Sequence, residues 1–229
     1  MSKFLLKVLS ITHWTDTLFS FQIERPKDFK FKSGEFVMIG LPNIDKPILR
    51  AYSICSPSWD DKLEFYSIIV ENGPLTSKLK NIKINDEIIL MSKSTGTLIL
   101  DALKPAKRLF LFSTGTGFAP FSSIIRDPET YDKFEQIIVT HTCRHKNELH
   151  YSEAIIKECL NDEILKSFIE NKLIYYKTTT QDKTEFYGRI TNKIHDKSFF
   201  NDLKLDELNF LTDCVMLCGS LDFNYLNCH

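Results

Sequence analysis

Residues 108–120, RLFLFSTGTGFAP, decide how this chain folds. The apolar run at 108–113 is typical of a buried strand, and Gly115 and Gly117 punctuate the turn that follows it. Downstream the hydrophobic pattern predicts an amphipathic stretch at 121–125, a helix near 148–160, and strands at 136–142, 173–177 and 214–218. Strands that alternate with helices indicate a parallel sheet with crossover helices, so the second half is predicted to be an α/β domain.

The first half of the sequence has a different pattern of hydrophobic and turn-forming residues. Six short strands are predicted there, separated by clusters of Pro, Gly, Asn and Asp, at residues 4–11, 18–24, 36–41, 48–55, 63–70 and 87–91. One helical turn at 75–79 follows Gly73-Pro74, where proline is well placed to open a helix. This spacing predicts a small antiparallel β-barrel. The chain is therefore expected to have two domains, 1–103 and 104–229, with the boundary near Lys104-Pro105.

Composition narrows the class of protein. The 229 residues are 43% hydrophobic and 26% charged, with 29 basic against 30 acidic residues, so nucleic acid is not an expected partner. No apolar run is long enough to span a membrane, and Lys3 and Lys7 interrupt any signal-peptide core. The six cysteines show no CxxC pair. We expect a cytoplasmic protein with reduced thiols.

Three segments of the first half carry chemistry. They are Arg50-Ala51-Tyr52-Ser53, then Glu64-Phe65-Tyr66-Ser67, then Gly73-Pro74-Leu75-Thr76-Ser77. A flavin ring needs an aromatic face and a hydrogen bond near N5, which Tyr52 and Ser53 offer, while its pyrophosphate needs a cation such as Arg50 and the N–H groups of an opening helix. Taken singly, these are a surface arginine, a strand aromatic and a turn. Their order along the chain predicts FAD binding.

The turn at Ser113–Pro120 is the second constellation. Gly115 and Gly117 would let the backbone approach a dinucleotide pyrophosphate, which the next helix N-terminus would favour. Pro120 replaces the third glycine of the usual dinucleotide fingerprint, and no acidic residue takes the ribose role. A plain strand-to-helix turn is the competing interpretation.

The order RAYS, GPLTSKL, STGTGFAP and CGS resembles the ferredoxin–NADP reductase family, and is most similar to the bacterial ferredoxin/flavodoxin–NADP reductases. The resemblance runs from Trp14 through GEFVMIG at 34–40 to Cys218-Gly219-Ser220. It implies an FAD-binding antiparallel barrel followed by an NADP-binding α/β domain. The implied reaction takes hydride from NADPH to FAD and passes single electrons to ferredoxin or flavodoxin.

The resemblance also implies site residues. FAD contacts fall on Arg50, Ala51, Tyr52, Ser53, Tyr66, Pro74, Leu75, Thr76 and Thr116, next to Ser67 and Gly73. NADP contacts fall on the turn with Thr116 and Gly117, on Cys143, Arg144, Thr179 and Thr180, and on Arg189, Gly219 and Ser220. Tyr52, Ser53 and Cys218 are the expected catalytic residues, with Cys218 facing the nicotinamide.

Two departures from the family pattern affect the expectations. Family members carry an arginine in a T-R-E arrangement where this chain has Gln181, so NADP selectivity is expected to depend on Arg144 and Arg189. After Ser220 the family continues with a helix and a last strand, whereas only nine residues follow here. The second domain is therefore expected to lack its C-terminal helix and strand, and a flavin cover by Phe223 or Tyr225 is the less favoured hypothesis.

Alternatives remain open at the level of sequence. An NAD(P)H–flavin reductase or a dioxygenase-type reductase would share both domains. A flavin-binding module that lost catalysis with its shortened C-terminus is the alternative outside enzymes. A metal cluster of His141, Cys143, His145 and His150 is a weaker hypothesis, because no fourth ligand is obvious. No metal is predicted.

Overall fold

The computed structural model describes residues 2–42, 47–220 and 223. These residues form two compact units: the first comprises Met1–Ala102 and Ala119–Asp127, and the second comprises Leu103–Phe118 and Pro128–His229. The main division lies within one residue of the boundary expected from sequence. The return of Ala119–Asp127 to the first unit was not predicted.

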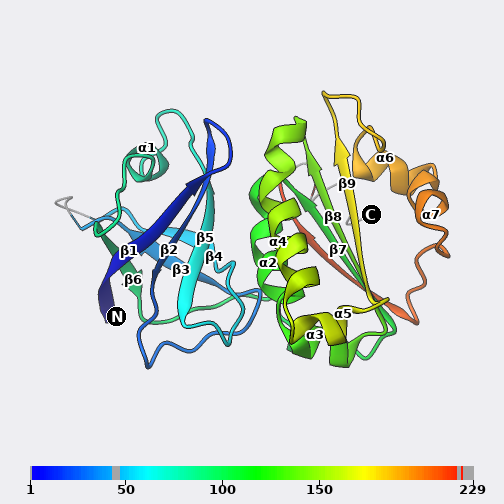
Figure 1. Ribbon diagram of the computed structural model, residues 1–229, viewed down its shortest axis with the longest axis horizontal. Helices are drawn as coiled ribbons and strands as arrows, with labels where there is room; N and C mark the ends of the chain where they lie inside the picture. The colour runs from blue at the N-terminus through cyan, green and yellow to red at the C-terminus, as the bar shows by residue number, and fades with distance from the viewer. Residues whose placement is uncertain (1, 43–46, 221–222, 224–229) are drawn as a thin grey trace. The chain divides into compact units, whose positions relative to one another are not determined.

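The first unit is built on an antiparallel sheet of six strands (Figure 1). Their order across the sheet is β4-β3-β6-β1-β2-β5. In chain order the strands are β1 (Lys3–His13), β2 (Leu18–Glu24), β3 (Phe36–Gly40), β4 (Arg50–Ser53), β5 (Lys62–Ile68) and β6 (Glu87–Met91). A single-turn helix, α1 (Thr76–Leu79), lies between β5 and β6, and a short 3₁₀ helix, η1 (Leu100–Ala102), follows β6.

The sheet of the first unit curls into a barrel. Beyond the end of β4 the Cys55 N–H donates to the Glu64 carbonyl of β5, at an N to O distance of 2.8 Å, so the two outer strands of the order meet. Alternate residues of the strands point inward and form one apolar core, which includes Val8, Phe19, Phe21, Ile39, Phe65 and Ile88. The predicted barrel is confirmed.

The second unit holds a parallel sheet of four strands in the order β10-β7-β8-β9. The strands are β7 (Arg108–Thr114), β8 (Gln136–Cys143), β9 (Leu173–Thr179) and β10 (Asp213–Cys218). Between them lie α3 (Pro128–Lys133), α4 (His150–Asn161), α5 (Leu165–Ile169), α6 (Ile190–His195), α7 (Ser198–Leu203) and the 3₁₀ turns η2 (Gly115–Gly117) and η3 (Lys146–Leu149). Helix α2 (Phe118–Ile125) begins in this unit and continues in the first. The predicted α/β architecture is confirmed.

Helices cover both faces of the parallel sheet. Figure 1 shows α4 on one side of β8 and β9, and α6 and α7 on the other. The α6–α7 side buries a phenylalanine-rich cluster that includes Phe110, Phe112, Phe199 and Phe200. Because strand residues alternate between faces, His141, Cys143 and Tyr175 lie on the α4 side. Among the described residues no helix is long and apolar enough to span a bilayer.

Candidate cofactor sites

Strand β4 carries the RAYS segment at the end of the barrel sheet. It pairs with β3 alone among the described strands, and Arg50 and Ala51 are exposed. The Arg50 guanidinium folds back to donate to the Leu49 carbonyl, at 2.9 Å. Tyr52 and Ser53 are half-buried. An exposed cation thus lies two residues from a partly covered phenol.

Tyr52 is held from two sides. Its hydroxyl lies 3.1 Å from the Ser67 hydroxyl of β5, and its ring meets Phe65 edge to face with centroids 6.3 Å apart. Burial raises the pKa of Tyr52 above its ordinary value, so the phenol stays protonated. Tyr66 and Ser67 are both buried. The structure therefore brings the RAYS segment and the Tyr66-Ser67 pair together.

The turn at Gly73 is closely packed. A Cβ on Gly73 would lie 2.3 Å from the Thr76 hydroxyl oxygen. The Gly73 carbonyl accepts from the Ser77 hydroxyl at 2.5 Å, and Leu75 is buried in the barrel core. Because α1 has only four residues, its dipole is small. An anion here would be bound by individual N–H groups rather than by a helix dipole.

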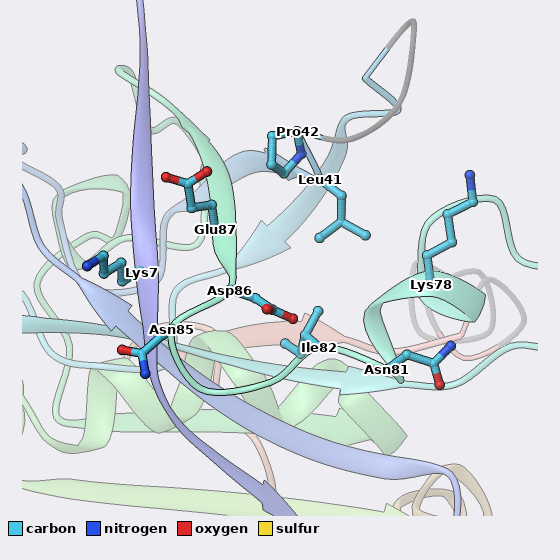
Figure 2. A pocket seen from close by; sticks show the side chains of 9 residues that line it. All are labelled: Lys7, Leu41, Pro42, Lys78, Asn81, Ile82, Asn85, Asp86 and Glu87. Carbon is cyan, nitrogen blue, oxygen red and sulfur yellow. The ribbon is translucent and has the colours of Figure 1, made fainter.

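A separate pocket of about 610 Å³ lies on the first unit beside α1 (Figure 2). Its lining mixes both charge signs with amides and apolar groups: Lys7, Leu41, Pro42, Lys78, Asn81, Ile82, Asn85, Asp86 and Glu87. The Asp86 carboxylate already accepts from the Lys83 N–H at 2.8 Å. This pocket contains none of the predicted site residues.

In the second unit the predicted nucleotide residues gather at one edge of the sheet. The carboxyl ends of parallel strands meet there, which is where α/β sheets bind ligands. Strand β7 leads into Gly115–Gly117, β8 ends at Cys143, β9 ends at Thr179, and β10 ends at Cys218. From the sequence, each of these four segments was predicted to follow its own strand. The order of the strands in the sheet brings the four segments to the same edge.

Two of these segments interlock without room for side chains. A Cβ on Gly117 would lie 2.1 Å from the Cys218 carbonyl oxygen, and a Cβ on Gly219 would lie 2.1 Å from the Thr114 hydroxyl oxygen. The Thr114 hydroxyl also accepts from the Ser220 N–H at 3.2 Å. The glycines therefore permit close packing of the turn after β7 against the end of β10 at the sheet edge.

A buried histidine contacts the turn that follows β7. The His141 Nε2 is 2.8 Å from the Gly115 carbonyl oxygen and 3.2 Å from the Cys143 sulfur. Desolvation lowers the pKa of His141 to about 4 and raises that of Cys143 well above its ordinary value. Both groups are therefore neutral at physiological pH.

The Arg144 segment is fixed by two carboxylates. Glu148 accepts from the N–H groups of Arg144 and His145, at 2.8 and 3.1 Å. Asp182 accepts from the Lys146 N–H at 2.7 Å and lies 3.1 Å from the His145 Nδ1. These bonds lower the pKa of Asp182. Sequence reasoning assigned no role to either carboxylate.

Position 181 lies directly beside Arg144. The Gln181 N–H donates to the Arg144 carbonyl at 2.9 Å, and the side chains of both residues are exposed. Arg189 is also exposed and forms the N-cap of α6. Thr179 is buried, and its hydroxyl donates to the Asp182 carbonyl at 2.6 Å. Thr179 is thus a structural support for the strand end, while Thr180 is half-buried.

Comparisons with known proteins assign the chain to a family. Residues 5–98 match the oxidoreductase FAD-binding domain family. The flavodoxin/ferredoxin–NADP reductase of Rhodobacter capsulatus is 51% identical over 218 residues, covering 95% of this chain and 81% of that protein. The ferredoxin–NADP reductase of Azotobacter vinelandii is 45% identical over 214 residues, covering 93% and 83%. This chain belongs to the ferredoxin/flavodoxin–NADP reductase family.

A solved structure supports the same membership. The ferredoxin NADP⁺ reductase of Neisseria gonorrhoeae, determined with bound FAD and NADP, superposes with a TM-score of 0.88 at 26% identity. The match covers 98% of this chain and 88% of that one. The two-domain architecture expected from the family resemblance is therefore confirmed.

The C-terminal region of this family member is described up to Ser220 and at Phe223. Cys218 is half-buried, and desolvation raises its pKa to about 11, so it is a neutral thiol. Phe223 packs into the phenylalanine-rich cluster of the second unit, together with Phe110 and Phe199. Its core position explains its burial without a flavin contact. Tyr225 lies outside the described residues.

The metal hypothesis finds no site in the part of the chain that is described. His141 and Cys143 are close together, but His145 faces Asp182, and no group of three ligating side chains forms among residues 2–42, 47–220 and 223. The thiols of Cys143, Cys214 and Cys218 are free.

Proposed function

We propose that this chain is an FAD-dependent ferredoxin/flavodoxin–NADP⁺ reductase. The observation that carries the proposal is the glycine-rich turn after β7, which packs against the end of β10 where Gly117 meets Cys218 and Gly219 meets Thr114. A glycine-rich turn at the carboxyl ends of parallel strands suits the pyrophosphate of a dinucleotide, because its backbone N–H groups can approach the ligand closely. Relatives that are 43–51% identical over most of the chain carry names of this activity.

On the first unit, we assign FAD binding to the segments around β4, β5 and α1. Arg50 neutralises pyrophosphate charge, the half-buried Tyr52 lies against the isoalloxazine, and Ser53 donates near N5. Ala51, Tyr66, Ser67 and the turn of Gly73, Pro74, Leu75 and Thr76 complete the binding surface. The residues fit the cofactor because a phenol held by Ser67 offers a fixed aromatic face beside an exposed cation.

On the second unit, we assign NADP binding to the sheet edge. Thr116 and Gly117 approach the pyrophosphate, while Gly219, Ser220 and the neutral thiol of Cys218 line the nicotinamide end. Cys143, Thr179 and Thr180 shape the floor, and Arg144 and Arg189 attract the 2′-phosphate. When bound, FAD accepts hydride from NADPH and passes electrons singly to ferredoxin or flavodoxin. The protein binds, orients and shields the reacting groups. We assign Tyr52 and Ser53 of the first unit to the flavin and Cys218 of the second unit to the nicotinamide.

Anaerobic titration of the purified holoprotein with NADPH tests this proposal. Bleaching of the flavin absorption band, followed by reoxidation with added ferredoxin or flavodoxin, is the expected result. A band that persists would favour a flavin-binding module, and reduction that serves only free flavin would favour an NAD(P)H–flavin reductase. A dioxygenase-type reductase would need an iron–sulfur partner protein. The proposed location is cytoplasmic, which the free thiols of Cys143, Cys214 and Cys218 support.

Arg50→Ala is expected to weaken FAD binding by about 2 kcal/mol, close to thirtyfold, because it removes a charge-assisted contact to the pyrophosphate. The measurement is the FAD dissociation constant, determined by fluorescence of released flavin. Arg50→Lys keeps the charge without the planar fork and should lose less. Undiminished flavin occupancy of Arg50→Ala at low FAD would count against the assignment.

Gln181→Arg is expected to increase the preference for NADPH over NADH by about 1.5–3 kcal/mol, roughly tenfold to a hundredfold. Position 181 lies beside the Arg144 carbonyl, so the new guanidinium would add a cation to the same surface. Steady-state kcat/KM for both nucleotides measures the ratio. Gln181→Met, of similar length and uncharged, is the matched control. An unchanged ratio in Gln181→Arg would show that this position does not reach the 2′-phosphate.

A further inference from the structure

A chain of hydrogen bonds lies under the turn that follows β7. His141 is fully buried, with Nε2 2.8 Å from the Gly115 carbonyl oxygen and Nδ1 2.7 Å from the Ser152 hydroxyl oxygen. The Ser152 hydroxyl oxygen lies 2.7 Å from the Tyr175 hydroxyl. The imidazole also stacks on Phe118, with centroids 4.9 Å apart. Every polar atom of the imidazole thus has a partner.

The partners fix where the imidazole carries its proton. A carbonyl oxygen only accepts, so Nε2 must bear the hydrogen that faces Gly115. A neutral ring then leaves Nδ1 as an acceptor for the Ser152 hydroxyl, and Tyr175 donates to Ser152 in turn. The Leu149 carbonyl, 2.9 Å away, competes for the Ser152 proton, but only donation to Nδ1 satisfies the buried ring nitrogen.

The Gly115 carbonyl accepts two hydrogen bonds, the first of them from His141. Its oxygen also accepts from the Phe118 N–H, so both acceptor positions are used. Gly115 has φ +52°, and a Cβ there would meet no atom within 4 Å. This glycine is therefore required by its conformation rather than by space.

The orientation of the Gly115 carbonyl also sets the direction of the Thr116 N–H, because the two groups belong to the same peptide. In a trans peptide the carbonyl and the next N–H point in opposite directions. The Gly115 carbonyl points to His141, so the Thr116 N–H points away from the buried cluster. Thr116 follows the carboxyl end of β7, at the sheet edge that carries the proposed NADP site.

We propose that His141 is a positioning residue for the nucleotide-binding turn. Its Nε2–H holds the Gly115 carbonyl inward, and this aims the Thr116 N–H at an anionic dinucleotide. The inference rests on the proposed NADP site at this edge and adds the residue that sets the geometry of the turn. His141 itself does not touch the nucleotide.

Two variants of the holoprotein distinguish the roles of the two ring nitrogens of His141. In His141→Gln the side-chain amide nitrogen reaches the place of Nε2, whereas in His141→Asn it reaches only the place of Nδ1. Both lose the stacking on Phe118, so they are matched. His141→Gln is expected to keep the KM for NADPH within about threefold of the parent value. His141→Asn is expected to raise it about tenfold with little change in kcat or flavin content.

A second measurement reports the turn without any nucleotide. Hydrogen–deuterium exchange of the Thr116 and Gly117 amides should be about tenfold faster in His141→Asn than in His141→Gln. Ser152→Ala leaves the imidazole in place and should raise the KM for NADPH by about threefold. If His141→Asn does not fold, this variant tests the positioning role of His141 in its place.

Equal KM values and equal exchange in the two His141 variants, or an unchanged Ser152→Ala, would overturn the proposal. A purely structural role would instead change flavin content and thermal stability equally in both. If the parent protein oxidises no NADPH, the proposed function fails, and the exchange rates still decide whether His141 positions the turn.

Discussion

Replacing Arg126 with alanine is expected to lower the free energy of unfolding of the first unit by about 3–5 kcal/mol, because it leaves a buried carboxylate without its partner. The Arg126 Nη2 lies 2.8 Å from the Glu64 carboxylate. Less than a tenth of the surface of each side chain is exposed. Urea unfolding of the holoprotein, followed by flavin fluorescence, measures the change.

Arg126 joins a segment of the chain to a distant part of the same unit. The guanidinium also donates to the Cys55 carbonyl at 2.6 Å, and the next residue, Asp127, accepts from Ser33 at 2.6 Å. The Ser123 hydroxyl donates to the Ser56 carbonyl at 2.7 Å. These bonds hold Ala119–Asp127 to the barrel, so the loss of Arg126 removes the centre of a network.

Two controls separate this ion pair from surface electrostatics. Lys133→Ala breaks the exposed pair with Glu129, whose ions are 2.8 Å apart, and should cost less than about 1 kcal/mol. The double variant Arg126→Met with Glu64→Leu removes both charges and should recover most of the stability lost in Arg126→Ala. A loss below about 1 kcal/mol in Arg126→Ala would show that solvent replaces the guanidinium.

The strands could be predicted from sequence because their signal is local. Alternation in the first half and apolar runs in the second predicted all ten described strands, within a few residues. Helices α3, α5, α6 and α7 were missed because they have only five or six residues, too few for a helical period to stand out. The attachment of Ala119–Asp127 to the barrel was missed because it depends on pairs such as Arg126 with Glu64, which are 62 positions apart.

The site shows the same contrast between local and distant information. The RAYS, GPLTSKL and TGTG segments are each contiguous, so the residue order by itself indicates a cofactor. His141 was weighed only as a metal ligand, because its partners Gly115 and Ser152 are 26 and 11 positions away. A signal did exist: His141 lies one residue before the end of the predicted strand 136–142, and such a position in a parallel sheet lies beside the turn that follows the neighbouring strand.

Acidification is expected to reduce the stability of the second unit through His141. Its pKa is lowered from the ordinary 6.5 to about 4 in the fold, whereas the unfolded chain binds a proton near 6.5. The contribution of the neutral ring is therefore fully present above pH 6.5 and is lost as the pH falls towards 4. The loss amounts to about 2 kcal/mol at pH 5 and about 3 kcal/mol at pH 4. Urea unfolding at a series of pH values measures it.

His141→Gln identifies the source of this dependence, because glutamine does not titrate. The stability difference between the parent protein and His141→Gln should shrink by about 2 kcal/mol between pH 7.5 and pH 5. Cys143 and Tyr175, which face the imidazole, have raised pKa values and stay uncharged over this interval, and Glu153 contributes only its distant charge. Asp182 and Asp213 have pKa values below the ordinary 3.8, so their contributions are lost mainly at lower pH. A stability difference that stays constant from pH 7.5 to 5 would contradict this expectation. It would mean that the buried imidazole accepts a proton as readily as the unfolded chain does, despite the desolvation of its charged form.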